Sequence, residues 1–202
     1  MPSSSSRQPE DLAIRFVNTV AWRLQDPSEE RLGSPEVLLR WLQQNDVIAP
    51  DESQVLASAW KARPETAATV YDSALRLREA IYALLVSVIN RRPADAAVMA
   101  YFSAFVGRPS ALRLQWRDRG PSWSATASPE TAEDLLRPIA LSAAALITGP
   151  RADRIKQCED DRGCGWLFVD DSRRKNRRWC SMGDCGNVAK ARRHRARKGG
   201  GA

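Results

Sequence analysis

All four cysteines of this 202-residue chain fall within a span of 28 residues near the C-terminus. Cys158 and Cys164 form one pair and Cys180 and Cys185 form a second, with fifteen residues between the pairs. Structural zinc sites use two such pairs, usually with about two to four residues inside each, so the spacing is a loose match. Four thiolates on one zinc ion contribute roughly 10 kcal/mol or more to the folding of a segment too small to bury its own core. The spacing therefore predicts a structural Zn²⁺ site.

Other fates of the four thiols stay open at this point. An iron–sulfur cluster uses the same ligands but usually needs a tight run of cysteines or a Cys-Pro pair, which the chain lacks. Unrelated surface thiols would have no reason to gather in one segment. Disulfides are disfavoured because the polar start of the chain carries no signal peptide, which indicates a reducing, cytosolic location. The sole histidine, His194, is not needed as a ligand, since four thiolates complete a structural site.

The residues around the cysteines suggest a small fold. The stretch "GWLFVD" (165–170) has the pattern of a short strand, and the polar run 171–177 fits a hairpin loop. The chain would then return so that Trp179 lies opposite Trp166 or Phe168. A helix is expected after Asn187. A knuckle, a hairpin and a helix with the second cysteine pair near its start form a treble-clef-like zinc finger.

Positive charge is concentrated in the same region. Residues 1–150 hold 16 Lys and Arg against 17 Asp and Glu, whereas residues 151–202 hold 15 against 7. Between positions 172 and 198 there are eleven basic residues and one acid, Asp184. The expected loop carries Arg173, Arg174, Lys175, Arg177 and Arg178, and the expected helix carries Lys190, Arg192, Arg193, Arg195, Arg197 and Lys198. Such a cluster indicates a polyanionic partner.

We interpret these basic residues as a DNA-binding surface. A solvated or disordered tail is the usual alternative, but a metal-bound module directly before the helix argues for a positioned element. Charge that nearly encircles a helix favours phosphate contacts over base reading. RNA is disfavoured because single-strand readers expose aromatic platforms, whereas the three aromatic residues here are expected to form the small core of the finger.

The first 150 residues predict a mainly helical domain, which makes the chain α+β, mainly α. Apolar spacing predicts helices over 11–24, from Pro35 to 44, and from Pro50 onward. The strongest pattern is the apolar stripe of 64–93, which Pro93 ends, and a further helix is expected over 94–106.

A short β-hairpin and a last helix are expected next. Alternating apolar residues over 111–118 predict a half-buried strand, with "RGPS" as the turn and 123–128 as the returning strand. Ser128-Pro129 would cap a final helical region, which Pro138 would kink or restart before Gly149-Pro150 ends it.

The helical part shows no catalytic pattern. It lacks a Gly-rich phosphate loop, a serine-nucleophile elbow and paired histidines, and adjacent acids such as Glu29 and Glu30 are usually solvated, so we expect no enzyme. Asn18 and Thr19 interrupt an apolar segment and must be hydrogen-bonded if buried. They either make core hydrogen bonds or line a small-molecule effector pocket. The most apolar run, 141–147, is too short to span a bilayer, so no membrane contact is expected.

The segment 164–197, with "WCSMGDCGN" leading into a Lys/Arg/Ala run, resembles the CGNR-type zinc finger. "FVNT" (16–19) and "RLREAIYALL" (76–85) resemble the ABATE domain that precedes this finger in a bacterial family of stress-induced transcription regulators. The resemblance implies that the four cysteines are the zinc ligands. It also implies that the finger binds DNA and that the N-terminal domain senses a ligand or stress.

Two features depart from the family pattern. Val188 stands where the family name has arginine, and the first cysteine pair encloses one residue more than usual, within "EDDRG" (159–163). Losing that arginine removes a cation at the start of the helix and puts its contact in doubt. The surplus residue lies in a loop that can absorb it.

Together these patterns predict a DNA-binding transcription regulator of the bacterial cytoplasm, associated with the nucleoid. We expect an ABATE-like domain over 8–150 and a finger over 151–198, flanked by a disordered start (1–7) and a flexible tail (199–202). A homodimer would enlarge the contact area of one small finger. The alternative function is a protein- or RNA-interaction module with a ligand-binding N-terminal domain.

Overall fold

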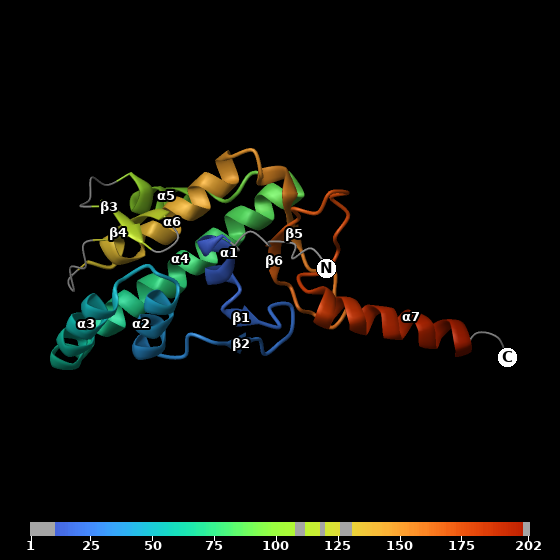
Figure 1. Cartoon of the computed structure of the whole chain (residues 1–202), viewed down its shortest axis with the longest axis horizontal. Helices are drawn as coiled ribbons and strands as arrows, with labels where there is room; N and C mark the ends of the chain where they lie inside the picture. The colour runs from blue at the N-terminus through green and yellow to red at the C-terminus, as the bar shows by residue number, and fades with distance from the viewer. Residues whose placement is uncertain (1–10, 108–111, 118–119, 126–130, 200–202) are drawn as a thin grey trace.

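A 27-residue helix, α4 (Pro64–Asn90), is the central element of the structure. Its apolar residues recur every three or four positions, so that Val70, Ala74, Leu77 and Ile81 are buried along one side. The helices α1, α2, α3, α5 and α6 all pack against it. The computed structural model describes residues 11–107, 112–117, 120–125 and 131–199 (Figure 1).

Several helices begin where the sequence predicts. Ser34 precedes α2 (Pro35–Gln44), and its Oγ accepts a hydrogen bond from the Val37 amide at 3.4 Å. Proline in the first turn begins α3 (Pro50–Ala62). α4 ends as predicted before Pro93, where Arg91 adopts a left-handed φ of 51°. α5 (Ala96–Val106) confirms the helix expected over 94–106.

The predicted helix over 11–24 is wrong beyond residue 17. α1 (Leu12–Val17) ends after six residues, and the chain continues into β1 (Val20–Ala21), which pairs antiparallel with β2 (Glu29–Glu30). The apolar pattern continues past the end of α1, but Asn18 and Thr19 form other hydrogen bonds. The Thr19 hydroxyl donates to the Phe16 carbonyl at 2.7 Å, and the Asn18 amide bonds to a distant strand.

The predicted hairpin is present, with a shifted turn. β3 (Leu112–Arg117) pairs antiparallel with β4 (Gly120–Ala125), so Gly120 and Pro121 lie in the strand and not in the turn. The burial of these strands lies outside what the structure describes, as does the expected cap at Ser128-Pro129. α6 (Ala132–Thr148) continues through Pro138 as one helix. Burial of Ile139 and Ala143 after the proline offsets its missing hydrogen bond, so the helix does not restart there.

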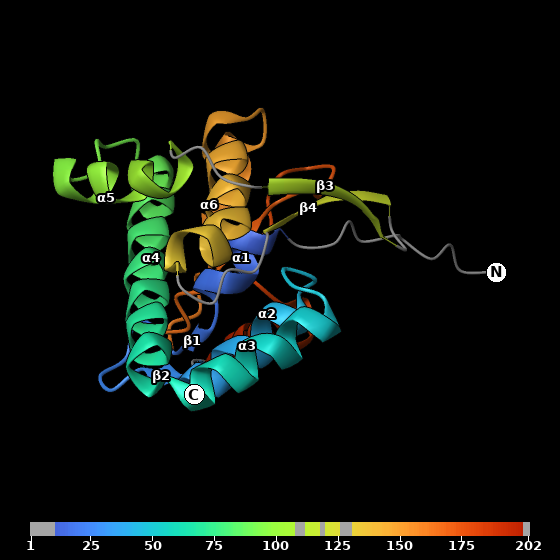
Figure 2. The same ribbon diagram turned by 90° about the vertical axis from the view of Figure 1, so that its left-hand side faces the viewer.

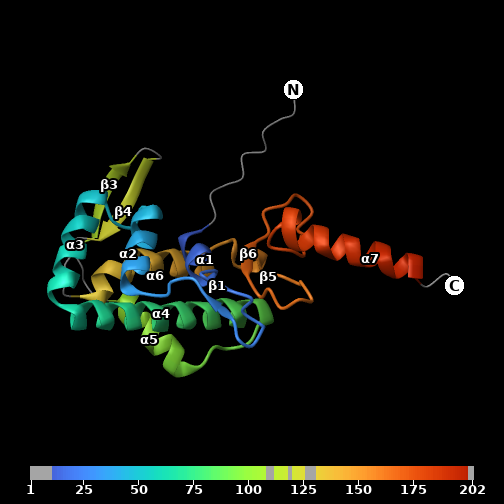
Figure 3. The same cartoon turned by 90° about the horizontal axis from the view of Figure 1, so that it is seen from below.

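The C-terminal module begins inside the core of the helical body. β5 (Ile155–Gln157) pairs antiparallel with β6 (Leu167–Val169), and Ile155, Leu167 and Val169 belong to the same apolar cluster as the helices. Figure 2 shows α4 and α6 side by side, with α5 across α4. In Figures 1 and 3, by contrast, α7 (Asn187–Gly199) extends away from the rest of the molecule.

Among the residues that the structure describes, no helix is both long and apolar enough to cross a membrane. The expected disorder over 1–7 lies outside the described residues. So does the expected tail beyond Gly199, which is the last residue of α7.

Candidate metal centre and basic surface

The first cysteine pair lies in the loop that joins β5 to β6. Cys158 directly follows β5, and its amide donates to the Trp166 carbonyl at 2.8 Å, which extends the strand pairing toward the thiols. The prediction that Trp179 returns opposite Trp166 or Phe168 is wrong, because β5 takes that place beside β6. The returning chain instead makes one backbone hydrogen bond, from the Glu159 amide to the Arg178 carbonyl at 3.0 Å.

Two glycines shape the turn around Cys164. Gly163 and Gly165 have φ values of +88° and +66°, which glycine adopts without strain. A Cβ on Gly165 would lie 2.8 Å from the Leu24 side chain, so the body approaches the turn closely. The backbone amides of Arg23 and Leu24 donate to the carbonyls of Cys164 and Gly163 at 3.0 and 3.1 Å. The segment after β1 therefore holds this turn in place.

The loop between Cys158 and Cys164, which is one residue longer than is usual in the family, is held by hydrogen bonds to Asp160. Its carboxylate accepts hydrogen bonds from the Arg162 backbone at 3.1 Å and from the Arg162 guanidinium at 2.6 Å. The guanidinium lowers the pKa of Asp160 and lies 5.1 Å from the centre of the Trp22 ring. The surplus residue of the loop is therefore accommodated in a tight, charged turn, and the two thiols still face one point.

The second cysteine pair lies at the start of the C-terminal helix. Cys180 precedes a single π-helical turn, η2 (Met182–Gly186), which contains Cys185. The Gly186 amide donates to the Ser181 carbonyl at 2.9 Å and closes this turn. α7 follows directly at Asn187, which confirms the helix expected there.

The four thiols meet at one point. Their Sγ atoms all lie within 4.8 Å of one another, with 3.7 Å between Cys164 and Cys180 and 3.8 Å between Cys180 and Cys185. A tetrahedral zinc ion with Zn–S bonds of about 2.3 Å places its sulfur atoms roughly 3.8 Å apart. All four are free thiols, and all but the half-buried Cys180 are buried. The spacing and the burial fit a closed, structural zinc site.

The electrostatics of the cluster also fit a bound cation. Hydrogen bonds from Cys164 and Cys180 hold the pKa of Cys158 well below its usual range. Hydrogen bonds with Cys158 raise the pKa values of Cys164 and Cys180, and burial raises the pKa of Cys185. One thiolate therefore forms readily, but it disfavours a second beside it. A bound dication offsets the repulsion between neighbouring thiolates, because its charge stabilises all four of them at once.

Some of the predicted DNA-binding residues are engaged within the protein. Arg177 is half-buried: its Nε donates to the Trp179 carbonyl at 2.7 Å, another guanidinium nitrogen reaches the Cys180 carbonyl, and the group lies 4.4 Å from the Phe168 ring centre. Arg178 pairs with Glu159 at 2.5 Å. Of these two, Arg177 supports the metal centre and presents little charge to solvent.

Other predicted residues remain exposed. Arg173, Arg174 and Lys190 are exposed and form no ion pair within the part of the chain that the structure describes. Weak surface pairs engage Lys175 with Asp153 at 3.4 Å and Arg192 with Asp161. The predicted residues Arg193, Arg195 and Arg197 lie on α7, the first two with exposed side chains and the third with its side chain outside the described part.

One aromatic ring joins the basic loop to the basic helix. Arg178 lies 5.4 Å and Arg193 5.5 Å from the centre of the Trp179 ring. Cation–π contacts of this kind contribute about 0.5–1 kcal/mol at exposed sites. The loop cations and the first turns of α7 therefore form one continuous surface.

A buried carboxylate orders the basic loop. Asp170 follows β6 and is fully buried, and its oxygens accept hydrogen bonds from the Lys156 ammonium at 2.6 Å, the Arg177 amide at 2.8 Å and the Ser172 hydroxyl at 2.5 Å. Burial alone would raise the pKa of Asp170, but these hydrogen bonds lower it to about 2. Lys156 also donates to the Lys175 carbonyl at 2.6 Å. In the sequence, the feature that could have indicated this role is the acidic pair Asp170-Asp171, which lies directly between a strand and a run of basic residues.

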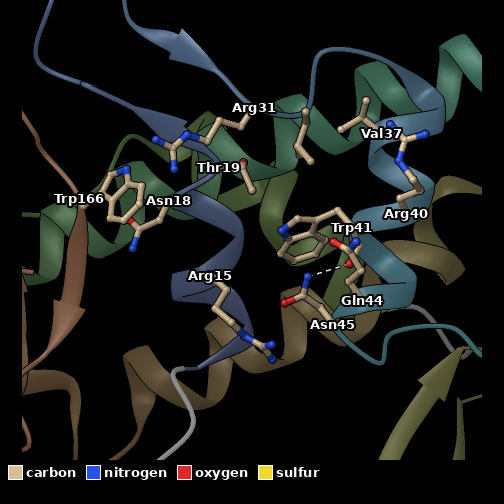
Figure 4. Close-up of a pocket in the computed structure, with 11 residues that line it drawn as sticks. Arg15, Asn18, Thr19, Arg31, Val37, Arg40, Trp41, Gln44, Asn45 and Trp166 are labelled. Atoms are coloured by element: carbon tan, nitrogen blue, oxygen red, sulfur yellow. Dashed lines mark hydrogen bonds between the residues drawn. The ribbon is translucent and has the colours of Figure 1, made fainter. Parts of the chain in front are cut away.

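Asn18 joins the helical body to the finger. Its amide nitrogen donates to the Leu167 carbonyl at 2.8 Å, and its amide oxygen accepts from the Leu167 amide at 2.9 Å. The Thr19 hydroxyl accepts from the buried Arg78 at 3.2 Å. Both residues also line a pocket of about 410 Å³, with Trp41 and Trp166 on opposite sides (Figure 4). The sequence indicated neither tryptophan as part of this pocket.

Glu30 has a structural partner. Both of its carboxylate oxygens bond to the Arg78 guanidinium, at 2.8 and 2.6 Å, and Arg78 is buried. Burial would raise the pKa of Glu30, but the hydrogen bond from Arg78 lowers it. The residue therefore fixes β2 to α4.

The fold and the thiol cluster define a zinc-finger protein whose finger is attached to a helical domain. Comparison with family models gives two matches in chain order. Residues 10–150 match the ABATE family, described as "putative stress-induced transcription regulator", and residues 154–198 match the CGNR zinc finger. The chain therefore belongs to the ABATE family and carries a CGNR finger with a structural zinc ion. Neither match is to an enzyme family. No curated protein matches the chain.

Proposed function

We propose that this protein is a DNA-binding transcription regulator of the bacterial cytoplasm. In this proposal the finger and α7 contact DNA, and the helical domain responds to a small-molecule effector. The observation that carries the proposal is the group of exposed cations, Arg173, Arg174 and Lys190, beside a metal-held helix. Cations with no ion-pair partner among the described residues are available to phosphates.

The loop is suited to phosphate contact because its backbone is fixed. Asp170 binds the amide of Arg177, and Lys156 binds the carbonyls of Lys175 and Arg177, at 2.6–3.2 Å. A loop ordered in the free protein loses less conformational entropy on binding than a flexible tail. α7 points away from the body, so a duplex can approach it without contacting the other helices (Figures 1 and 3).

Val188 marks a difference from the family within this surface. It is half-buried in the first turn of α7, where an arginine would place a cation. We expect phosphate contacts at this end of the helix to come from Lys190 instead. The Val188→Arg variant is then expected to strengthen DNA binding.

The test measures binding to a mixed-sequence duplex as a function of salt. With about six phosphates neutralised, log K falls with log salt at a slope of about −5. The double variant Arg173→Ala/Arg174→Ala is expected to bind more weakly and to change the slope by about two. Arg92→Ala, which removes an exposed arginine at the end of α4, serves as the matched control and leaves both values unchanged.

Binding without salt dependence, or an equal loss in the control variant, would refute the proposal. Single-stranded RNA or an acidic protein that competes as well as the duplex would favour the alternative interaction module. Dimerisation stays a prediction from the small contact area of one finger, and the mass of the complex on a duplex tests it.

A further inference from the structure

The pocket beside Asn18 lies between the helical body and the finger. Its walls come from α1, the segment around β2, α2 and the residue before β6, and its volume of about 410 Å³ is in the range of small-molecule sites. Trp166 is the finger's contribution (Figure 4). An occupant would therefore touch both parts of the molecule.

The lining of the pocket is positively charged. Arg15, Arg31 and Arg40 contribute guanidinium groups, and none of the described residues that line the pocket is acidic. Arg31 pairs through Nε with Glu29 at 3.1 Å, just outside the pocket. Arg40 forms no hydrogen bond or salt bridge with any residue that the structure describes, but its charge, after the hydrogen bond from Ser34, helps to lower the pKa of Glu36 one turn earlier in α2. Guanidinium groups in such a setting select carboxylate or phosphate.

Two indole rings give the pocket flat apolar sides. Trp41 packs on Phe16, with ring centres 5.1 Å apart, and Trp166 is fixed by a hydrogen bond from its Nε1 to the Val20 carbonyl at 2.8 Å. Arg31 lies 5.1 Å from the Trp166 ring centre, so charge and ring face occur together. Rings held in this way favour a planar ligand.

We propose that this pocket binds a small aromatic carboxylate and that, through Trp166, its occupancy stabilises the zinc finger. The carboxylate lies toward Arg31 and the ring lies against Trp166, at the end of the pocket where these two side chains lie together (Figure 4). The proposal names the class of effector for the function proposed above. Its binding step does not depend on DNA.

The link from the pocket to the metal centre is short. Trp166 is two residues from Cys164, and its carbonyl accepts the hydrogen bond from the Cys158 amide. The next residue, Leu167, is held on both backbone atoms by Asn18, which also lines the pocket. A ligand that contacts Trp166 therefore restrains residues 164–167, which connect the first pair of zinc ligands to the strand that packs on the body.

The first experiment compares four probes on the full-length zinc-loaded protein. They are 2-naphthoate, neutral 2-naphthamide, cyclohexanecarboxylate and inorganic phosphate, and calorimetry with ligand-observed NMR gives their affinities. We expect 2-naphthoate to bind with a Kd of about 1 mM or below and at least about tenfold more tightly than each of the other three, because only it satisfies both charge and ring.

Two arginine variants test the position of the carboxylate. Arg31→Met is expected to weaken 2-naphthoate about tenfold and to change the unfolding midpoint little, because the ion pair that Arg31 forms with Glu29 is exposed and such pairs contribute little stability. Arg92→Met, outside the pocket, leaves binding unchanged. No binding of 2-naphthoate, equal binding of the amide, or phosphate binding as tight as the aromatic acid would each overturn the proposed ligand class.

The second experiment tests the effect on the finger. The rate of zinc loss to an excess of chelator is measured with and without 2-naphthoate at ten times its Kd. If zinc leaves only after the pocket opens, the ligand slows the loss by up to about tenfold, and Arg31→Met, with a Kd about tenfold higher, reduces the protection to about twofold at the same ligand concentration. Tight binding with an unchanged rate would overturn the link to the finger. Both experiments omit DNA, so a failure of DNA binding would not affect their outcome.

Discussion

The helical body and the zinc finger are held together in different ways. The body buries a continuous apolar cluster in which Leu38, Leu42, Leu77 and Ile81 are fully enclosed. The finger's own cluster consists of the cysteines with partly buried Trp22, Trp166 and Trp179. One of these three tryptophans belongs to the body. The finger therefore depends on a metal ion and on its neighbour, whereas the apolar cluster of the body needs no metal ion.

The change from stabilisation by an apolar core to stabilisation by a metal ion does not occur at the sequence boundary between the body and the finger. β5 and β6 belong to the finger in sequence, but Ile155 and Leu167 are part of the body's apolar cluster. The segment from the second cysteine pair to the end of α7 has no such support. We therefore expect stability to change within the finger, after β6, and four predictions test this.

The largest effect is expected from breaking the metal centre. Cys180→Ser removes one of four thiolates, and structural zinc contributes roughly 10 kcal/mol to small fingers. We expect zinc content to fall from one per chain to near zero and trypsin to cut within 171–199, while the body keeps its helical circular dichroism. Ser181→Ala, at the next position, keeps its zinc. Unfolding of the whole chain in Cys180→Ser would contradict the comparison.

A core substitution should have the opposite pattern. Leu77→Ala creates a cavity at a fully buried site of α4 and is expected to lower the free energy of unfolding in urea by about 2–5 kcal/mol. Zinc content below the transition stays at one per chain. Val55→Ala, at a residue that is 63% exposed, changes the free energy by less than about 0.5 kcal/mol. Loss of zinc from folded Leu77→Ala would show that the two regions are not separable.

The link between the regions gives an intermediate effect on both. Asn18→Ala leaves the amide and the carbonyl of Leu167 without their partner, which costs about 2 kcal/mol for buried groups. We expect a lower urea midpoint and faster zinc loss to a chelator. Ser58→Ala, which removes one hydrogen bond to the Gln54 carbonyl within α3, is the control for zinc loss and leaves it unchanged. If Asn18→Ala lowered the urea midpoint without speeding zinc loss, or sped zinc loss without lowering the midpoint, the proposed link between body and finger through Asn18 would be contradicted.

The smallest and most local effect is expected in the basic loop. Asp170→Asn weakens the hydrogen bonds to Ser172 and Arg177, and we expect hydrogen exchange of these two amides to rise about tenfold with zinc retained. Asp153→Asn removes an exposed carboxylate from Lys175 and leaves exchange unchanged.

The pH dependence of this loop follows from its buried carboxylate. The folded-state pKa of Asp170 is lowered from 3.8 to about 2, so its stabilisation is complete above about pH 5 and is lost progressively as the pH falls toward 2. The difference in exchange between wild type and Asp170→Asn should therefore be constant from pH 6 to 8. A difference that varies across this range would contradict the assignment.

Features with local causes could be predicted from the sequence. Helices α2, α3, α4 and α5 follow from apolar periodicity, an N-cap serine and prolines in first turns, all of which act within one or two turns. The four zinc ligands follow from their confinement to one segment, and the basic surface follows from the charge distribution. These signals need no knowledge of distant residues.

The tertiary structure decided what depends on distant partners. α1 ends at Val17 because Asn18 bonds to Leu167, 149 positions away, and no local pattern contains that bond. The pairing of β5 with β6, the enclosure of Asp170 and the pocket between Trp41 and Trp166 have the same origin. In each, a polar group or ring gains a partner only when remote segments pack together, because burial makes an unsatisfied hydrogen bond costly.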